Sequence, residues 1–360
     1  MSAGTDAGVD TLASAAVWLL ALFNMHILLV SRNRIPVFAY GGTERVIWDL
    51  GRALSRLGHP VSYLVKPRSR CDFADVLTID KSRPLLPQVR DAMRQQGADV
   101  VHFQSNPFAD AAEAQSFDVP NLMTEHGNSE AGTWYPQNVV FISRDHAVRH
   151  GSEQFVYNGL DWSAYGEVDF NARRRHFHFL GKGDWPFKNL QGAIDVALKA
   201  GVPLDVLGGK RLQSRNGWRF TWQPSIHFHG MVGGARKFAL LNASRGMVFP
   251  VRWHEPFGLA VIESLYFGCP VFATPYGAIP ELVPAQCGVL SNSLSTLAGA
   301  LGDAGRFSQQ ACHVQARENF NAERTARGYL DKYQRVLDGQ PLHAQPPSTL
   351  VHPRDLPWLA

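Results

Sequence analysis

The chain has 360 residues, of which 45% are hydrophobic and 18% are charged, as in an ordinary globular protein. A single core usually stops growing below this length, so two domains are expected. The net charge of +4 is too small to indicate nucleic-acid binding, although it suits an anionic ligand or a weak attraction to anionic lipid. The four cysteines show neither close pairing nor zinc-ligand spacing, which indicates small buried side chains in a reducing compartment.

The amino-terminal segment, residues 1–24, resembles neither a membrane span nor a signal peptide. Ala15–Phe23 is apolar, but this run is too short to cross a bilayer. Asp6 and Asp10 precede it without any Lys or Arg, which is wrong for a signal peptide. We therefore predict that the fold begins at Met25 and that residues 1–24 are a leader with no catalytic role. A short interfacial anchor is the alternative.

From Met25 onward, short apolar runs alternate with amphipathic helices, as in a doubly wound α/β domain. The clearest predicted helix is Thr43–Leu57, and a second is predicted at Pro84–Gln96. The predicted strands are His26–Val30, Val61–Val65, Asp99–Gln104, Asn121–Glu125 and Val139–Ser143, with a last short strand at Gln154–Val156. Strands separated by helices indicate parallel pairing with right-handed crossovers, so residues 25–165 are predicted to form a first doubly wound domain.

The segment from Asn158 to Arg175 breaks this pattern and is the predicted domain junction. The pattern restarts within residues 166–318, which predicts a second doubly wound domain. Its predicted strands are His176–Leu180, Leu204–Leu207, Ile226–His229, Met247–Val251 and Val271–Ala273. Its predicted helices are Lys188–Lys199, Gly234–Ala243 and Phe257–Phe267. A final helix, Glu323–Leu337, is predicted within residues 319–338, and the Pro-rich tail at residues 339–360 is expected to be loosely held.

Doubly wound domains bind ligands outside the carboxyl ends of their strands, so candidate site residues are expected there. Gly41 and Gly42 stand at the amino end of a predicted helix, where the backbone can closely approach an anion. Simple turn formation is the structural alternative for these glycines. Glu125 and His126 follow a predicted strand, although a loop histidine is more often a plain hydrogen-bonding residue.

Two lysines follow the first strand of the second domain. Lys182 and Lys188 belong to the run FLGKGDWPFKN at residues 179–189. Two ammonium groups in this position could clamp a pyrophosphate and stabilise it as it leaves. A solvated loop that merely carries two lysines is the alternative, and the intervening Asp184 slightly favours it.

The most informative segment, residues 249–283, reads FPVRWHEPFGLAVIESLYFGCPVFATPYGAIPELV. Pro256 is predicted to begin a helix, with Glu255 before it and Glu263 about two turns inside, roughly 12 Å away. This distance exceeds the separation of paired carboxylates in glycoside hydrolases, about 5–5.5 Å in retaining and about 6.5–9.5 Å in inverting enzymes. We therefore interpret the two acids as acceptors for separate hydroxyl groups of one long ligand. For Glu263 alone, a pairing with a nearby Lys or Arg is the alternative.

With these motifs the chain resembles the retaining family-4 glycosyltransferases of the GT-B fold, also called group 1 glycosyl transferases. The resemblance covers about Met25–Leu337, and its strongest part is E-P-F-G-L-x-x-x-E at 255–263, followed by G-C-P-V at 268–271 and G-A-I-P-E-L-V at 277–283. It implies an α/β fold of two Rossmann-like domains that face each other across a cleft. The first would bind the acceptor and the second the nucleotide-sugar donor, and the final helix would cross back to the first domain.

The resemblance also implies two sets of site residues. The catalytic set is His126, Lys182, Lys188 and Glu255. The donor-binding set is Gly41, Gly42, Phe257, Gly258, Leu259 and Glu263. Glu263 would take the ribose hydroxyls, the lysines would hold the diphosphate, and His126 would lie near the reaction centre. The family often has Arg at the position of Lys182, where Lys supplies a point charge in place of a bidentate fork.

The implied reaction is a hexosyl-type transfer with retention of configuration, in bacterial glycan or glycolipid synthesis. The acceptor hydroxyl would attack from the face that the nucleoside diphosphate leaves, and the departing phosphate would take its proton. Neither a metal nor a cofactor is expected besides the nucleoside-diphosphate sugar itself, in agreement with the absence of a D-x-D triplet from the sequence.

Two other functions fit the same outline: a nucleotide-sugar isomerase of the hydrolysing 2-epimerase type, and an inactive nucleotide-sugar-binding protein. The acceptor is expected to be a glycan, a lipid-linked sugar or a small molecule, and no nucleic-acid partner is expected. Trp134, Tyr135, Arg32 and Arg34 are candidates for the acceptor site, with packing as the alternative for the aromatic residues. A cytoplasmic location is expected, and lipid-linked acceptors would add peripheral contact with the inner membrane face.

Overall fold

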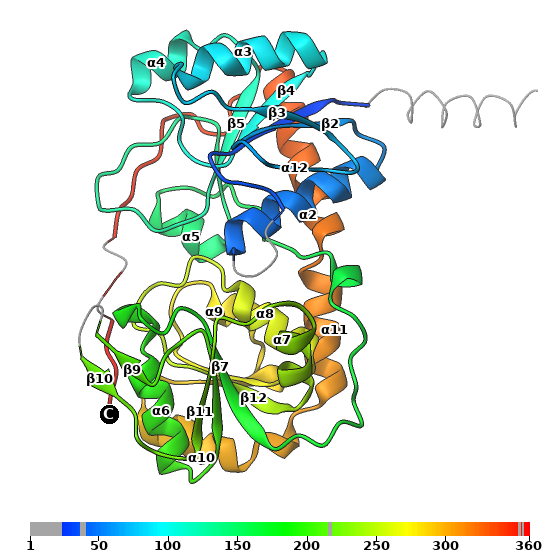
Figure 1. Ribbon diagram of the computed structural model, residues 1–360. Helices are drawn as coiled ribbons and strands as arrows, with labels where there is room; N and C mark the ends of the chain where they lie inside the picture. Colours follow the sequence, from blue (N-terminus) through cyan, green and yellow to red (C-terminus); the bar gives the residue numbers. More distant parts are fainter. Residues whose placement is uncertain (1–23, 37–40, 215–217, 352–353, 355) are drawn as a thin grey trace, which may run out of the picture.

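The protein consists of two α/β lobes, each built on one six-stranded sheet (Figure 1). The computed structural model describes residues 24–36, 41–214, 218–351, 354 and 356–360. The predicted leader therefore lies outside the described residues, apart from Asn24. Within the described ranges, no helix is both long enough and apolar enough to cross a membrane.

The first sheet has the strand order β3-β2-β1-β4-β5-β6, and all neighbouring strands are parallel. Its strands are β1 (Ile27–Val30), β2 (Val61–Val65), β3 (Asp75–Thr78), β4 (Val100–Phe103), β5 (Asn121–Glu125) and β6 (Val139–Phe141). The helices of this lobe are α2 (Gly42–Arg56), α3 (Leu85–Gln96), α4 (Ala111–Ser116) and α5 (Arg144–Arg149). Central strands such as β1 are buried along their whole length, because helices cover both faces of a parallel sheet.

The second sheet has the order β11-β8-β7-β12-β13-β14 and is also parallel throughout. Its strands are β7 (His176–Leu180), β8 (Leu204–Leu207), β11 (Ile226–Gly230), β12 (Ser244–Phe249), β13 (Val271–Ala273) and β14 (Gly288–Leu290). The helices are α6 (Leu190–Lys199), α7 (Gly234–Asn242), α8 (Leu259–Tyr266), α9 (Ile279–Leu282), α10 (Leu294–Gly302) and α11 (Gln309–Asn319). A small antiparallel hairpin, β9 (Leu212–Gln213) with β10 (Arg219–Phe220), projects from this lobe. The predicted pair of doubly wound domains is thereby confirmed.

Two predicted elements differ in the structure. The strand expected at Gln154–Val156 is absent from the sheet, and Phe155 forms only an isolated bridge to Phe141. Helix α8 begins at Leu259 and not at Pro256, because Gly258 holds a left-handed backbone conformation with φ of 110° at the position before the helix. Glu263 is consequently about one turn inside the helix, and not two.

The last helix, α12 (Ala322–Leu337), crosses from the second lobe to the first, as predicted (Figure 1). The Asn321 side chain caps its amino end by accepting a hydrogen bond from the Arg324 N–H. On the first lobe, two buried tyrosines anchor the helix: the Tyr333 hydroxyl lies 2.8 Å from His102 Nδ1, and the Tyr329 hydroxyl lies 2.7 Å from Thr124 Oγ1. The helix therefore belongs to the core of the first lobe.

The carboxyl-terminal tail is not loosely held, contrary to the prediction. On the first lobe, Thr349 exchanges backbone hydrogen bonds with Gly132 and Thr133. The chain then returns to the second lobe, where the Leu356 N–H donates to the Arg252 carbonyl. Leu359 exchanges backbone hydrogen bonds with Asn292 and Leu294, at the start of α10. The prolines misled the prediction because they remove backbone donors, while enough N–H and C=O groups remain between them to hold the tail.

Candidate active site

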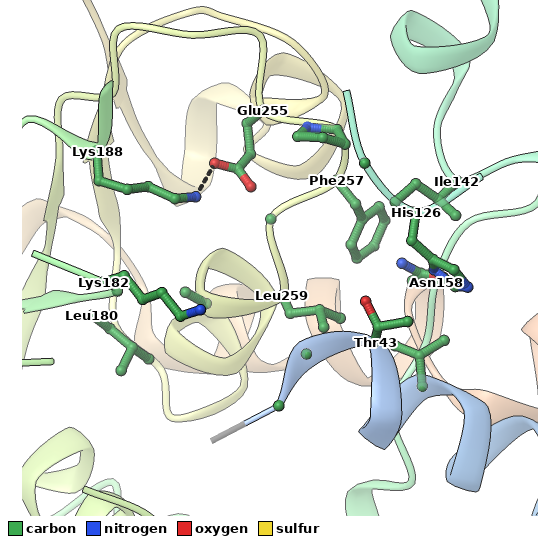
Figure 2. Close-up of a pocket in the computed structure, with 18 of the residues that line it drawn as sticks. Thr43, His126, Ile142, Asn158, Leu180, Lys182, Lys188, Glu255, Phe257 and Leu259 are labelled. Atoms are coloured by element: carbon green, nitrogen blue, oxygen red, sulfur yellow. Dashed lines mark hydrogen bonds and ion pairs between the residues drawn. The ribbon is translucent and has the colours of Figure 1, made fainter. Parts of the chain in front are cut away.

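A cavity of about 470 Å³ lies between the two lobes, at the carboxyl ends of their strands (Figure 2). The first lobe contributes Gly41, Gly42 and Thr43 at the start of α2, and His126 and Gly127 after β5. The second lobe contributes residues that follow β7 and β12: Gly181, Lys182, Lys188, Trp253, Glu255, Phe257, Gly258 and Leu259. Nine of the ten predicted site residues therefore line one cavity, and Glu263 is the exception.

Glu255 is held firmly on the cavity wall. Its Oε2 lies 2.6 Å from the ammonium group of Lys188 and accepts a 2.8 Å hydrogen bond from the indole N–H of Trp253. The Lys188 ammonium also lies 4.6 Å from the centre of the Trp253 ring. Glu255 is 7% exposed, and its other oxygen points into the cavity (Figure 2). The carboxylate thus keeps one oxygen for a ligand.

The backbone on either side of Glu255 is fixed by the opposite lobe. Asn128 donates to the His254 carbonyl at 2.7 Å, and the Ser143 hydroxyl donates to the Pro256 carbonyl at 2.7 Å. Within the second lobe, the Ala278 N–H donates to the Glu255 carbonyl at 2.9 Å. The position of this carboxylate therefore depends on how the two lobes are docked.

The cavity also contains a cation, Lys182, and the amino ends of two helices. Lys182 extends into the cavity from the end of β7, with its ammonium 4.6 Å from the centre of the Trp185 ring (Figure 2). Helices α2 and α8 both begin at the cavity, after Gly41 and Gly258 respectively, and neither has a side-chain cap. Free N–H groups at helix amino ends favour anions, so a lysine and two helix ends together give this part of the cavity an environment that favours negative charge.

His126 is a neutral hydrogen-bonding group in this environment. Burial lowers the pKa of its ring to about 4. Its Nε2 lies 2.9 Å from Gln104 Oε1, an amide oxygen that can only accept, so Nε2 carries the proton. Nδ1 is therefore unprotonated and can accept a hydrogen bond. Next to it, burial raises the pKa of the Glu125 carboxyl to about 7, although the Gly127 N–H donates to Glu125 Oε1.

Glu263 lies outside the cavity lining and takes part in an ion-pair network between the lobes. Its Oε1 accepts from Lys237 at 2.5 Å, from the Tyr165 hydroxyl at 2.7 Å, and from Arg45 of helix α2. Burial by itself raises the pKa of this carboxyl, but the charges of Lys237 and Arg45 lower it to about 2. The structure therefore pairs Glu263 with basic residues, as one reading of the sequence allowed.

The sequence missed some residues of this region. Trp253 carried a signal, because it precedes Glu255 by two positions and thus faces the same way in an extended chain. Arg45 and Lys237 carried none, because they reach Glu263 from helices remote in sequence. Within the described ranges, no three His, Cys, Asp or Glu side chains form a group suited to a metal ion.

The candidate acceptor residues are dispersed. Tyr135 is 1% exposed and packs against Phe141, and the half-buried Trp134, whose backbone forms a bridge with Ser348 of the tail, packs against the same core cluster. These two residues therefore serve packing. Arg32 lines a separate pocket in the first lobe, and Arg34 is exposed outside it.

The two facing lobes, the cavity between them and the returning helix define the GT-B class of fold. AviGT4, a glycosyltransferase involved in avilamycin A biosynthesis, superimposes with a TM-score of 0.68 at 21% identity, over 88% of this chain and 98% of its own. Sucrose-phosphate synthase from Thermosynechococcus elongatus gives 0.67 at 17% identity, over 88% and 100%. HepE from Anabaena, solved with UDP-glucose, gives 0.61 at 15% identity, over 88% and 99%. At such identities the likeness establishes the fold.

Two family models identify the family. The model for Glycosyltransferase Family 4 matches residues 40–162, and the model for Glycosyl transferases group 1 matches residues 173–304. The chain therefore belongs to the family-4, or group 1, glycosyltransferases. No curated protein matches the chain.

Proposed function

We propose that the protein transfers a sugar from a nucleoside-diphosphate sugar to an acceptor hydroxyl group, with retention of the anomeric configuration. The observation that carries this proposal is the convergence of Lys182, Lys188, Glu255 and two helix amino ends on one cavity between the lobes. Cations and free N–H groups suit a diphosphate, and a buried carboxylate beside them suits sugar hydroxyls. The UDP-glucose bound by HepE, which has the same fold, supports a donor of this type.

In the proposed complex, the diphosphate lies between Lys182 and the amino ends of α2 and α8. These groups stabilise the negative charge that develops on the phosphate oxygen as the bond to the anomeric carbon breaks. The acceptor hydroxyl attacks the anomeric carbon from the same face. Because the acceptor reacts on the face that the phosphate leaves, no protein carboxylate has to act as the nucleophile. The acceptor proton passes to the departing phosphate oxygen, so no protein base is required either.

The donor sugar lies between Glu255 and His126. The free oxygen of Glu255 accepts hydrogen bonds from sugar hydroxyls, while Lys188 and Trp253 hold the carboxylate in its orientation. The unprotonated Nδ1 of His126 accepts from another sugar hydroxyl near the reaction centre. In this proposal Glu263 receives the ribose hydroxyls only after Arg45 has moved away from it.

The proposed acceptor is a glycan, a lipid-linked sugar or a small molecule, in a bacterial glycan or glycolipid pathway. A cytoplasmic location with peripheral contact at the inner membrane face would suit a lipid-linked acceptor. The net charge of +4 is compatible with such contact.

A donor screen tests the proposal. The protein is first heated with UDP, GDP and ADP sugars, since a ligand at about 100 times its Kd adds about 2.7 kcal/mol to the free energy of unfolding. The stabilising donor is then incubated with a panel of acceptors, and NMR reads the anomeric configuration of the product. We expect release of the nucleoside diphosphate and a retained anomer. An inverted product, or an epimerised sugar formed without acceptor, would contradict the proposal.

A further inference from the structure

A second pocket in the first lobe is lined by basic residues. It has a volume of about 360 Å³ and lies at the carboxyl ends of β1, β2 and β3. Its charged lining residues are Arg32, Lys66, Lys81, Arg83 and Asp80. Four cations thus face one carboxylate, in a concave site on the same edge of the sheet as the loop that leads to Gly41.

The single carboxylate does not neutralise these cations. Asp80 Oδ1 accepts hydrogen bonds from the Ser82 N–H at 2.9 Å and from the Ser82 hydroxyl at 2.7 Å. Arg83 pairs with Asp91 on α3, with 2.9 Å between Nη2 and Oδ2. Within the described residues, no ion pair joins a carboxylate to Arg32, Lys66 or Lys81. All four cations are exposed to solvent around the pocket, where an anion can accept charge-assisted hydrogen bonds from several of them.

Side-chain hydrogen bonds fix the backbone that forms one wall of the pocket. Gln88, which is 6% exposed, fixes residues 80–84 through its side-chain amide. Its Oε1 accepts from the Asp80 N–H at 2.8 Å, and its Nε2 donates to the carbonyls of Asp80, Arg83 and Pro84 at 2.9 to 3.0 Å. The cations on this segment are therefore presented by a fixed backbone and do not require a loop to be ordered on binding.

The segment that follows β1 contributes residues to both the pocket and the cavity. Arg32 and Gly41 both follow β1, and nine residues of extended chain set an upper limit of about 30 Å between them. We propose that this pocket binds a phosphate or pyrophosphate group carried by the acceptor, and so places the acceptor hydroxyl at the cavity. The inference rests on the proposed function, since it assigns the chemical class of the acceptor.

Titration with inorganic pyrophosphate tests the pocket directly. The full chain should bind pyrophosphate at two places, the cavity and the pocket. The variant Lys66→Gln/Lys81→Gln should lose the pocket site, with at least a roughly tenfold weaker affinity. Lys182→Ala should weaken the cavity site alone. Phosphorus NMR or calorimetry resolves the two classes of site.

The matched control is Arg324→Gln/Arg327→Gln. It removes the same charge from helix α12, at two exposed side chains that lie outside the pocket. It should leave both sites unchanged. If the pocket variant titrates like this control and the wild type, the proposal is wrong.

Competition distinguishes the sources of the phosphate. Glycerol phosphate represents a soluble acceptor and phosphatidylglycerol vesicles a lipid-linked one. Displacement of pyrophosphate from the pocket by either supports the proposal and identifies the source. If neither displaces it, or if the variant loses vesicle binding while keeping pyrophosphate, the pocket does not serve an acceptor phosphate.

Hydrolysis of the donor without acceptor separates this inference from the proposed function. The pocket variant should hydrolyse the donor sugar at the wild-type rate, because the cavity is untouched. If no nucleotide sugar is turned over or bound by the wild type, the proposed function fails, whereas the pyrophosphate titration still reports on the pocket.

Discussion

At the scale of single residues, the most constrained side chain is Glu263. It is 4% exposed, and its partner Lys237 is 5% exposed. A buried charge is tolerated only when it is paired, and Lys237, Arg45 and Tyr165 all converge on one carboxylate oxygen. Because Arg45 belongs to the other lobe, the network also ties the amino end of α2 to α8.

Removal of this carboxylate should be costly for stability. Glu263→Ala leaves the buried Lys237 without its counter-ion, and breaking such a pair typically costs about 3–5 kcal/mol. Urea unfolding, followed by circular dichroism, measures this loss. The control is Glu323→Ala on α12, whose exposed pair with Arg327 is worth less than about 1 kcal/mol. Equal effects of the two substitutions would contradict a structural role for the network.

Sequence reasoning succeeds for those site residues whose chemistry is local. Gly41, Lys182 and Glu255 lie in the loops that follow β1, β7 and β12. The alternation of strands and helices therefore predicts that they meet at a cleft. The partners of Glu263 could not be predicted in this way. Arg45 is 218 positions away from it and Lys237 is 26, and no short pattern encodes the docking of three helices.

At the scale of elements, the turn before α9 supports the candidate site. Gly277 has a φ of 67°, in the left-handed region. A Cβ atom there would lie 2.3 Å from both the N and O atoms of Glu255, which form part of a backbone bridge. The glycine of the G-A-I-P-E-L-V run is thus needed because the backbone of Glu255 passes directly against it.

Gly277→Ala should therefore displace Glu255. We expect a loss of about 1–3 kcal/mol in stability from strain and overpacking, with a fall in donor turnover that exceeds the loss of folded protein. Thermal unfolding and initial rates measured on the same samples separate the two effects. Gly299→Ala in α10 is the matched control, since its new Cβ has no neighbour within 4 Å. A Gly277→Ala enzyme with full activity would show that the contact is unimportant.

The elements that the sequence predicted well are the buried apolar strands and the strongly amphipathic helices. Val61–Val65, Asn121–Glu125 and His176–Leu180 are observed with the predicted bounds. Strand β3 was missed because it lies at the edge of its sheet and half its residues are exposed, so it lacks an apolar run. The start of α8 was misplaced because Pro256 is a common first residue of helices, whereas the backbone of Gly258 determines the actual start.

At the scale of the whole molecule, the two lobes are joined by more than one crossing. Helix α12 enters the first lobe (Figure 1), and the tail contacts the first lobe through Thr349 and the second through Leu356. The prediction of two doubly wound lobes required only the order of the elements. The path of the tail could not be predicted, because its backbone hydrogen bonds depend on surfaces formed by the complete fold.

The buried histidines should make the whole fold sensitive to acid. Burial lowers the pKa of each of them below its ordinary value of 6.5, to about 4 or about 3 where the shift is defined. They include the fully buried His102, His146, His150 and His178 and the half-buried His126. The pKa values of His59, His254 and His343 are lowered in the same way. Their contribution is fully present above about pH 6.5, and it is lost as the pH falls, because the unfolded chain then binds protons that the folded chain excludes.

Two carboxyl groups oppose this effect. Burial raises the pKa of both Asp49 and Glu125 to about 7, so each disfavours the folded state as the pH rises towards that value. The histidines with a lowered pKa outnumber these two carboxyls, so the unfolded chain binds more protons than the folded chain below about pH 6.5, and the free energy of unfolding falls on acidification. Melting temperatures at constant ionic strength, from about pH 7.5 to about pH 5, measure the slope. A melting temperature that stays constant or rises on acidification would contradict it.

Donor chemistry is proposed to take place in the cavity between the lobes, where Glu255 binds the sugar. The most direct measurement is kcat/KM for nucleoside-diphosphate release by Glu255→Gln and by the wild type, with the identified donor and acceptor. Glutamine keeps the shape but loses the charge that Lys188 contacts and that is proposed to bind the sugar hydroxyls. We expect a loss of at least about 100-fold in a variant that remains folded. A folded variant with unchanged kcat/KM would show that Glu255 does not bind the reacting sugar.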